Sequence, residues 1–192
     1  MKIVFATNNQ NKVKEVQALL PNSIELMSLK DIECFEDIPE TQETIKGNAL
    51  QKANYVYDNY GFTCFADDTG LEVNALNGAP GIYSARYAGP DKNSENNIEK
   101  LLTELIHKKD RSARFKTVIA LVGINEPKTF EGICKGEITT KKEGEKGFGY
   151  DPVFKPNGHT STFSQMPLST KNTIGHRGKA VQQLITFLKS IN

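Results

Sequence analysis

Cysteine is scarce in this sequence, and the cysteines present form neither a metal-binding nor a disulfide pattern. Cys34, Cys64 and Cys134 are odd in number and widely spaced, and no C-x-x-C pair occurs. Zinc sites and disulfide frameworks rest on closely spaced or evenly numbered cysteines, so the sequence predicts neither. Because stable disulfides belong to oxidising compartments, this usage favours a reducing one, and we expect a cytoplasmic protein.

Long apolar runs and an excess of either charge are absent as well. The apolar run at residues 2–6 is too short for a signal peptide, and no run approaches the length that crosses a bilayer. Lys+Arg 24 against Asp+Glu 23 leaves a formal net charge of +1, so no overall field attracts nucleic acid or a membrane surface. A chain of 192 residues with 38% hydrophobic content can still bury a sizeable core, and we predict a single domain over residues 1–192.

Motifs of several other nucleotide-binding and hydrolytic enzymes are missing. The sequence contains no G-x-x-x-x-G-K-[ST] loop, and no G-x-G-x-x-G follows an expected strand. His107, His159 and His176 belong to no visible nucleophilic triad. These absences disfavour a P-loop NTPase and a triad hydrolase.

What the sequence does contain is an alternation of strand and helix patterns. Strands are expected near residues 3–6, 24–29, 63–71, 71–76, 115–124, 129–139 and from 151, and helices at 13–20, 43–60, 93–109 and 173–191. Because hairpins alternate with strand–helix units, the pattern predicts an α/β fold with a mixed rather than a purely parallel sheet.

Two adjacent carboxylates, Asp67 and Asp68, end the apolar run that begins at Thr63, and Gly70 follows as a turn residue. Their position predicts two acids at the tip of a buried strand, where desolvating a carboxylate is costly unless a cation or donor compensates. A surface Asp-Asp turn is the simpler interpretation of these residues alone. A metal site is favoured because the rest of the chain supplies phosphate-binding groups.

Cations crowd the starts of two expected helices, against the helix macrodipole. Lys12 lies in the first turn of the first helix, and Lys171, His176 and Arg177 lie around the start of the last one. An anion bound at the helix N-terminus would resolve the conflict, whereas a solvated lysine is the plainer alternative. Such conflicts between local rules concentrate at functional sites.

A glycine-rich loop carries aromatic side chains. Phe148, Gly149, Tyr150 and Asp151 place two aromatics and a carboxylate around a glycine, a set that could stack on a planar base and accept from its ring N–H. Together with the acidic segment 31–44, these features fit cleavage of a phosphate ester or anhydride by a water activated by a divalent metal. Mg²⁺ is the expected ion, because the available ligands are hard carboxylate oxygens.

Five motifs, in order along nearly the whole chain, resemble those of the inosine triphosphate pyrophosphatase family, the Ham1-like pyrophosphatases of non-standard purine nucleotides. They are Thr7-Asn8-Asn9-Gln10-Asn11-Lys12, like T-[GN]-N-x-x-K; Phe65-Ala66-Asp67-Asp68-Thr69-Gly70-Leu71, like A-D-D-[ST]-G-L; residues 78–87, like G-A-P-G-x-x-S-A-R-[YF]; Gly147-Phe148-Gly149-Tyr150-Asp151-Pro152; and the stretch from Ser169-Thr170-Lys171 to His176-Arg177. Five such motifs together are highly specific.

The resemblance implies an elongated two-lobed α/β fold, with a central mixed β-sheet flanked by helices and an active-site cleft between the lobes. It also implies a homodimer that binds small-molecule nucleotides rather than nucleic acid or a membrane. The implied reaction is Mg²⁺-dependent hydrolysis of ITP, dITP and XTP to the monophosphate and pyrophosphate, which clears deaminated purines from the nucleotide pool.

Carried over to this sequence, the resemblance implies that Asp68 is the general base and a metal ligand, with Asp67 beside it as support or as a further ligand. Glu40 would be the other metal ligand, and Glu43 is the alternative. The implied substrate-binding residues are Thr7, Asn8, Asn9, Gln10, Asn11, Lys12 and Lys171 at the triphosphate, Thr69 and Arg86 against the substrate, Phe148, Gly149, Tyr150 and Asp151 at the base, and His176 and Arg177 at its 6-oxo group.

Two positions depart from the family pattern. Asn8 stands where many relatives have glycine, and Asn11 replaces a residue that is frequently small. Asparagine tolerates the left-handed backbone region better than most residues, so the loop can keep its shape. The departures bear on triphosphate affinity rather than on the type of reaction.

Two other functions stay open. One is a related pyrophosphatase of pyrimidine or methylated nucleotides, against which the matches at residues 78–87 and at His176-Arg177 weigh. The other is a catalytically silent nucleotide- or RNA-binding module that uses Phe148 and Tyr150 as stacking platforms. The adjacent aspartates argue against such a module, because carboxylates beside a phosphate site repel the phosphate unless a metal intervenes.

Overall fold

The computed structural model describes residues 1–191 and divides them between two compact units. Unit 1 comprises residues 1–68, 117–132 and 177–191, and unit 2 comprises residues 69–116 and 133–176. Each unit therefore combines segments that are far apart in the sequence. The single domain expected over residues 1–192 stays a prediction.

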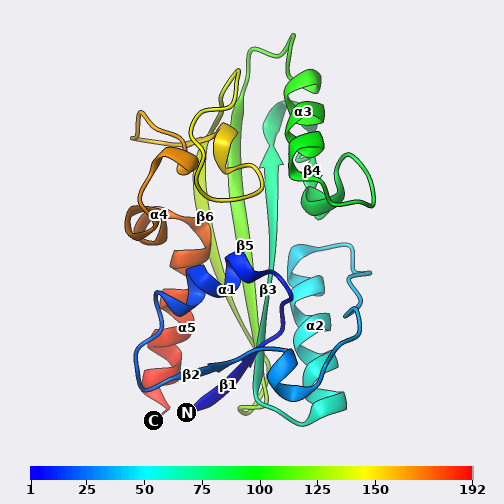
Figure 1. The fold of residues 1–192 in the computed structure, drawn as a ribbon, viewed down its shortest axis with the longest axis vertical. Coiled ribbons are helices and arrows are strands. Elements are labelled where there is room, and N and C mark those ends of the chain that lie inside the picture. The colour runs from blue at the N-terminus through cyan, green and yellow to red at the C-terminus, as the bar shows by residue number, and fades with distance from the viewer. Residues whose placement is uncertain (192) are drawn as a thin grey trace. The chain divides into compact units, whose positions relative to one another are not determined.

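Five α-helices and seven strands form the regular structure of the described residues (Figure 1). The helices are α1 (Gln10–Gln17), α2 (Ile45–Tyr60), α3 (Ser94–Glu104), α4 (Leu168–Ile174) and α5 (His176–Ser190). The strands are β1 (Lys2–Phe5), β2 (Glu25–Met27), β3 (Cys64–Val73), β4 (Pro80–Gly81), β5 (Ser112–Val122), β6 (Lys128–Ile138) and β7 (Phe154–Pro156).

The strands form one sheet with the order β2-β1-β3-β5-β6-β7, and β4 pairs with β3. β1 runs parallel to both β2 and β3, whereas the β3–β4 and β6–β7 pairs are antiparallel. The sheet is thus mixed, and the predicted α/β class with a mixed sheet is confirmed. The elongated two-lobed form with a cleft between the lobes stays a prediction.

Unit 1 packs helices on both faces of its strands (Figure 1). Side chains alternate across a strand, so Ile3, Phe5 and Phe65 share one face, where they pack with Val16 of α1 and Leu184 of α5. The opposite face is covered by α2. Burial of both faces explains why the first strand is a continuous apolar run in the sequence rather than an alternating one.

Capping residues set the ends of α2. Thr44 Oγ1 accepts a hydrogen bond from Gly47 N at 2.9 Å, and the helix ends at Gly61, whose φ of +72° suits a residue without a Cβ. Asn48 and Lys52 are polar, yet they lie on the buried side of the helix. α2 therefore presents hydrogen-bonding groups to the interior of unit 1.

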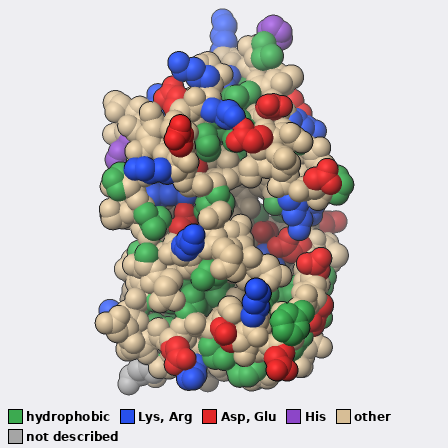
Figure 2. Space-filling view, in the orientation of Figure 1, with side chains coloured by type: hydrophobic (Ala, Val, Ile, Leu, Met, Phe, Trp, Pro, Cys, Tyr) green, Lys and Arg blue, Asp and Glu red, His purple; other side chains and the backbone are tan. Residues whose placement is uncertain are grey.

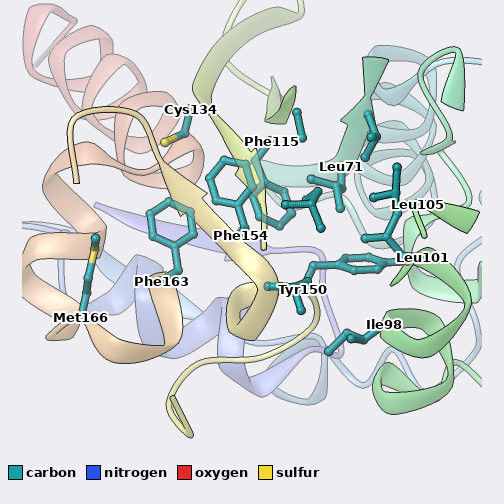
Figure 3. Packing of buried hydrophobic residues seen from close by; sticks show 14 residues of the cluster. Leu71, Ile98, Leu101, Leu105, Phe115, Cys134, Tyr150, Phe154, Phe163 and Met166 are labelled. Atoms are coloured by element: carbon teal, nitrogen blue, oxygen red, sulfur yellow. The ribbon is translucent and has the colours of Figure 1, made fainter. Parts of the chain in front are cut away.

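The core of unit 2 contains a group of aromatic rings among aliphatic side chains (Figure 3). The ring of Phe115 lies 4.7 Å from that of Phe154, and Phe154 lies 5.1 Å from Phe163, measured between ring centroids. Leu101 of α3 and Tyr150 complete the same buried cluster. Aromatic pairs in this geometry stabilise a core beyond the area they bury.

The predicted last helix, residues 173–191, corresponds to α5, and a separate short helix that was not predicted, α4, precedes it. Gly175 separates them with an extended backbone, and its N–H donates to Lys171 O at 2.8 Å. A Cβ on Gly175 would lie only 2.5 Å from that oxygen, so a larger residue would force the chain apart. The apolar pattern missed the break because it carries no information on how closely two backbone segments approach. α3 also ends earlier than predicted, at Glu104 rather than at residue 109.

The three cysteines lie in the interior, and charged side chains of both signs lie at the surface (Figure 2). Cys34, Cys64 and Cys134 are buried free thiols. On the face drawn in Figure 2, Lys and Arg side chains lie among Asp and Glu side chains, in keeping with the small net charge. Within residues 1–191, every helix is too short or too polar to span a membrane.

Candidate active site

The carboxyl end of β1 and the interior of β3 bring together residues that are far apart in the sequence. The two strands are parallel, with Phe5 opposite Phe65, so the segment that follows β1 lies beside the part of β3 that carries Asp67 and Asp68. The prediction that these acids lie at the tip of a strand is wrong, because β3 continues to Val73. Lys12 of α1 and Asp67 of β3 are 55 positions apart, yet Lys12 Nζ lies 2.9 Å from Asp67 Oδ1. This part of the sheet is where the predicted phosphate loop and the predicted acids meet.

Asp67 is fully buried, and each of its carboxylate oxygens is paired with a cation. Oδ1 accepts from Lys12, and Oδ2 accepts from Arg177 Nε at 3.1 Å. Burial alone would raise the pKa of Asp67, but Lys12, Arg177 and Lys52 hold this pKa below its usual range. Asp67 is therefore ionised. Lys12 and Arg177, the cations near the starts of two helices, thus have the Asp67 carboxylate of the protein itself as their anion.

Arg177 is held from two sides within unit 1. Its Nη1 donates to Glu15 Oε2 at 2.5 Å, and the side chains of both residues are almost fully buried. Burial disfavours the charged guanidinium, but Asp67 and Glu15 outweigh this effect and raise the pKa of Arg177. That Arg177 reads the 6-oxo group of a base stays a prediction. Glu15 was not predicted as a site residue. The feature that could have indicated it is an acidic side chain on the buried side of α1.

Asp68 lies next in the strand but in a different environment. Only 9% of the residue is exposed, and burial raises the pKa of Asp68 because the charged form loses its water. Its Oδ2 accepts from Asn48 Nδ2 at 3.3 Å, and its Oδ1 lies 3.9 Å from Lys52 Nζ. The two adjacent aspartates thus have opposite pKa shifts, a pattern that separates the roles of two carboxylates in one site.

Lys52 of α2 connects the acidic segment to these aspartates. It was not predicted as a site residue. Its ammonium bonds to the Glu40 carboxylate and donates to Asp67 O at 2.8 Å. Burial disfavours the charged ammonium, but Asp68, Glu40 and Asp67 together raise the pKa of Lys52, so it stays charged. A lysine on the otherwise apolar side of a helix was the available signal.

Asp68 and Glu40 share Lys52 and are the carboxylates best placed to hold a divalent cation together. Asp67 is less well placed to hold a divalent cation, because both of its carboxylate oxygens already bond to cations, Lys12 and Arg177. Among residues 1–191, no group of three or more His, Cys, Asp and Glu side chains could hold a metal ion alone. Two carboxylates nevertheless fit Mg²⁺, which is commonly completed by substrate phosphates and water. Glu43 is exposed, so the geometry supports Glu40 as the second ligand.

The loop between β1 and α1 is organised by its own side chains. Asn9 Oδ1 accepts from Asn11 N at 3.0 Å and from Lys12 N at 3.2 Å, which caps α1, and Thr7 Oγ1 accepts from Asn9 N. Neither Asn8 nor Asn11 has a positive φ, so these departures from the family pattern require no left-handed backbone. Thr7 and Lys12 are half-buried, whereas Asn8, Asn9, Gln10 and Asn11 are exposed. Triphosphate binding by this loop stays a prediction.

In unit 2 an ion pair ties the glycine-rich loop to α4. Asp151 Oδ2 accepts from Lys171 Nζ at 2.5 Å and from Phe148 N at 2.9 Å. The ammonium lies 4.8 Å from the centre of the Phe148 ring, and that ring is half-buried. Lys171, which we expected at the triphosphate, therefore lies beside residues that we expected at the base.

Two further residues expected at the base belong to the core of unit 2. Tyr150 is 4% exposed, packs in the buried cluster of Figure 3 and donates its hydroxyl to Ser84 O at 2.9 Å. The imidazole of His176, 3% exposed, stacks on the Phe115 ring with centroids 4.4 Å apart. Contact of either side chain with a base stays a prediction. The sequence pattern did not indicate which aromatic ring turns inward.

Thr69 and Arg86, the other predicted substrate contacts, are both half-buried in unit 2. Thr69 lies in β3, and Arg86 ends the short helical turn Ser84–Arg86, with its guanidinium carbon 5.3 Å from the centre of the Tyr83 ring. Ser84 anchors that turn, because its Oγ accepts from the main chain of β3 at 2.8 Å. The contact of either residue with substrate stays a prediction.

Replacing Gly147 by alanine is expected to lower the free energy of unfolding by about 3 kcal/mol. A Cβ at this position would lie 2.1 Å from Asp151 Oδ2, and the φ of +79° is unfavourable for any other residue. Gly149→Ala is a matched control, because φ there is +58° and nothing lies within 4 Å of the added Cβ. It should cost only the backbone strain, about 1 kcal/mol. Equal losses for both variants in urea unfolding would contradict this account of the loop.

The chain is similar to known proteins over nearly its whole length. Residues 3–187 match the Ham1 family. A protein of Flavobacterium johnsoniae named dITP/XTP pyrophosphatase is 62% identical over 188 residues, which covers 98% of each chain. A protein of the same name from Porphyromonas gingivalis is 51% identical, with 97% of each chain covered.

Solved structures extend this similarity to the fold. The Staphylococcus aureus Ham1 protein superposes with a TM-score of 0.91 at 41% identity and covers 100% of both chains. A HAM1 protein from Coxiella burnetii gives the same TM-score at 38% identity, with 99% of each chain covered. Because the similarity in sequence and in structure spans both units and the site described above, this protein belongs to the Ham1 family.

Proposed function

We propose that this protein hydrolyses dITP, ITP and XTP to the corresponding monophosphates and pyrophosphate. The observation that carries the proposal is the buried aspartate pair, in which Asp67 is held by two cations while Asp68 has a raised pKa and faces Lys52. Relatives 62% and 51% identical that carry the name dITP/XTP pyrophosphatase support the substrate class. The enzyme is a hydrolase that acts on non-canonical purine nucleotides.

Asp68 is the proposed general base. It accepts a proton from a water molecule whose oxygen attacks the α-phosphorus, and the bond from the α-phosphorus to the bridging oxygen breaks, so that pyrophosphate leaves. A raised pKa makes Asp68 a stronger proton acceptor than an ordinary carboxylate. Lys12 and Lys52 place positive charge beside Asp67 and Asp68, where it stabilises negative charge that develops on the phosphoryl oxygens.

Mg²⁺ is the proposed cofactor, held by Asp68 and Glu40 together with substrate oxygens and water. The buried charge cluster of unit 1 contains three cations and four carboxylates and so carries one net negative charge, which would repel a polyphosphate unless a cation intervenes. Bound there, Mg²⁺ supplies a Lewis acid for the transferred phosphoryl group. The members of the cluster are Lys12, Lys52 and Arg177 with Glu15, Glu40, Asp67 and Asp68.

The base is proposed to stack on Phe148, with Lys171 as the donor to its 6-oxo group. Hypoxanthine and xanthine carry an acceptor at C6, whereas adenine carries an amino donor. Because an ammonium can only donate, ATP would leave donors facing each other, at about 1–3 kcal/mol for each unpaired buried donor. The expected contacts of His176 and Arg177 with the 6-oxo group stay proposed as well, although the guanidinium of Arg177 also bonds to two carboxylates of unit 1.

The assembly and setting follow from the family resemblance. We infer a cytoplasmic homodimer in which residues 1–192 act as one elongated, two-lobed catalytic domain. Light scattering coupled to size-exclusion chromatography tests the dimer. A mass of one chain across the working concentration range would contradict it.

Product analysis tests the reaction itself. With Mg²⁺, we expect pyrophosphate from XTP, dITP and ITP, turnover of ATP at least about 10-fold slower, and loss of activity in EDTA. Orthophosphate as the product would move the attack to the γ-phosphate and contradict the mechanism. Turnover of pyrimidine nucleotides alone would favour the related pyrophosphatase, and nucleotide binding without any turnover would favour the silent module.

A further inference from the structure

One of the two proposed metal ligands lies in an irregular segment, residues 33–44, which runs from the end of a short helical turn to α2 and carries Glu40. The side chains of Thr41 and Gln42, directly after Glu40, are exposed. Asp68, by contrast, is built into a strand. Burial in a core therefore does not hold this part of the segment, and its position depends on specific hydrogen bonds to α2.

Gln51 of α2 makes two hydrogen bonds to Thr41. Gln51 Oε1 accepts from Thr41 N at 2.9 Å, and Gln51 Nε2 donates to Thr41 Oγ1 at 2.9 Å. One carboxamide thus bonds both the main chain and the side chain of the residue that follows Glu40. Two bonds between the same pair of residues restrict orientation as well as distance, which a single bond does not.

Asn48 and Lys52, one helical turn apart on α2, extend this contact to Asp68. Asn48 Oδ1 accepts from Gln42 N at 2.9 Å, while its Nδ2 donates to Asp68 Oδ2 at 3.3 Å. Lys52 bonds to Glu40 and lies 3.9 Å from Asp68 Oδ1. A single side of one helix therefore contacts both proposed metal ligands.

We propose that Gln51 is a positioning residue, which through its two bonds to Thr41 sets the separation of Glu40 and Asp68 at which these carboxylates hold a divalent cation. The inference rests on the proposed function. Groups that orient metal ligands from behind commonly change metal affinity by about 10–100-fold when they are removed. Gln51 itself contacts neither the cation nor the substrate in this proposal.

The N-terminal part of segment 33–44 is held by other hydrogen bonds. Tyr60 and Tyr55 donate their hydroxyls to Glu36 Oε1 at 2.5 and 3.1 Å. Gln51 is half-buried on the surface of α2, so its truncation leaves no cavity in the core. We therefore expect Gln51→Ala to fold and to release only the part of the segment around Glu40.

The test compares the Mg²⁺ dependence of XTP hydrolysis in four variants. In Gln51→Ala, the Mg²⁺ concentration for half-maximal kcat should rise about tenfold, while kcat at saturating Mg²⁺ stays within about twofold of wild type. Thr41→Val keeps the main-chain bond and should show a smaller shift, and the conservative Thr41→Ser should restore wild-type behaviour. Gln182→Ala, an exposed glutamine of α5, is the matched control and should change nothing.

Hydrogen exchange of the metal-free protein supplies a readout that needs no catalysis. The Thr41 amide should lose protection in Gln51→Ala and keep it in Gln182→Ala. A Gln51→Ala enzyme with the wild-type Mg²⁺ dependence, or one that loses kcat at saturating Mg²⁺ without a shift, would overturn the positioning role. Wild-type turnover that persists in EDTA would instead overturn the metal site of the proposed function, so the two failures are distinguishable.

Discussion

Asp68→Asn is expected to lower kcat for XTP by about 10²–10⁴-fold, the usual contribution of a general base. Asparagine has the shape of aspartate and can still bond to Asn48, but it cannot accept a proton from the attacking water. The fold should be retained, because Asp68 is not part of the ion pairs that Asp67 makes with Lys12 and Arg177. Pyrophosphate release at saturating Mg²⁺ and nucleotide measures the effect.

A matched control separates this effect from a general loss of charge on α2 or β3. Asp58→Asn removes an exposed carboxylate of α2 and should hydrolyse XTP at the wild-type rate. Titration calorimetry with XTP should show that Asp68→Asn still binds nucleotide, as expected for a variant impaired in chemistry. Hydrolysis by Asp68→Asn at the wild-type rate would show that the general base lies elsewhere.

Asp67→Asn is expected to destabilise the protein by about 3–5 kcal/mol at neutral pH. Asp67 is fully buried, and its carboxylate pairs with Lys12 and Arg177, so the substitution leaves positive charge in the interior without its counter-ion. Urea unfolding measures the change. Asp58→Asn should shift the free energy of unfolding by less than about 0.5 kcal/mol, as for most surface substitutions.

The loss of stability caused by Asp67→Asn depends on pH in a definite direction. The pKa of Asp67 is lowered in the folded state, so on acidification the unfolded chain binds this proton first. The stability that Asp67 contributes is therefore fully present above the unfolded carboxyl pKa of about 3.9, and it is lost as the pH falls below that value. The difference in the free energy of unfolding between wild type and Asp67→Asn should become smaller below about pH 4. A difference that grows on acidification would contradict the ion-pair account.

The double variant Asp67→Asn/Lys12→Met tests the pairing directly. If the two side chains act on each other, the double variant should lose less free energy of unfolding than the two single variants together, by about 0.5–3 kcal/mol. Strict additivity would show that the 2.9 Å contact contributes little.

Local patterns were sufficient for the order of the main elements and for placing the acids in a buried strand, although not at its tip. The apolar run at residues 3–6 became β1, and the run that ends in Asp67 and Asp68 became β3. The conflict between Lys12 and the dipole of its helix pointed to a residue whose partner is Asp67, and binding of a further anion at this helix start stays a prediction. Such features depend on a few neighbouring residues, which a single sequence displays.

Side-chain partners were not predictable in the same way. A polar residue on the buried side of a helix, such as Lys52 or Glu15, has meaning only when the group opposite it is known. The burial of Tyr150 and the partial exposure of Phe148 depend on how the loop packs in unit 2, and alternation does not apply to a loop.

By itself the sequence determined the mixed α/β class, the family and the kinds of residue available for phosphate chemistry, because motifs and periodicity are local. Only the tertiary structure decided which aspartate is paired and which has a raised pKa. Asp67 meets Lys12 and Arg177 across 55 and 110 positions of the chain, while Asp68 meets Asn48 and Lys52 of α2. Those contacts arise from the parallel pairing of β1 with β3 and from the packing of helices on both sheet faces, so chain neighbours alone could not reveal them.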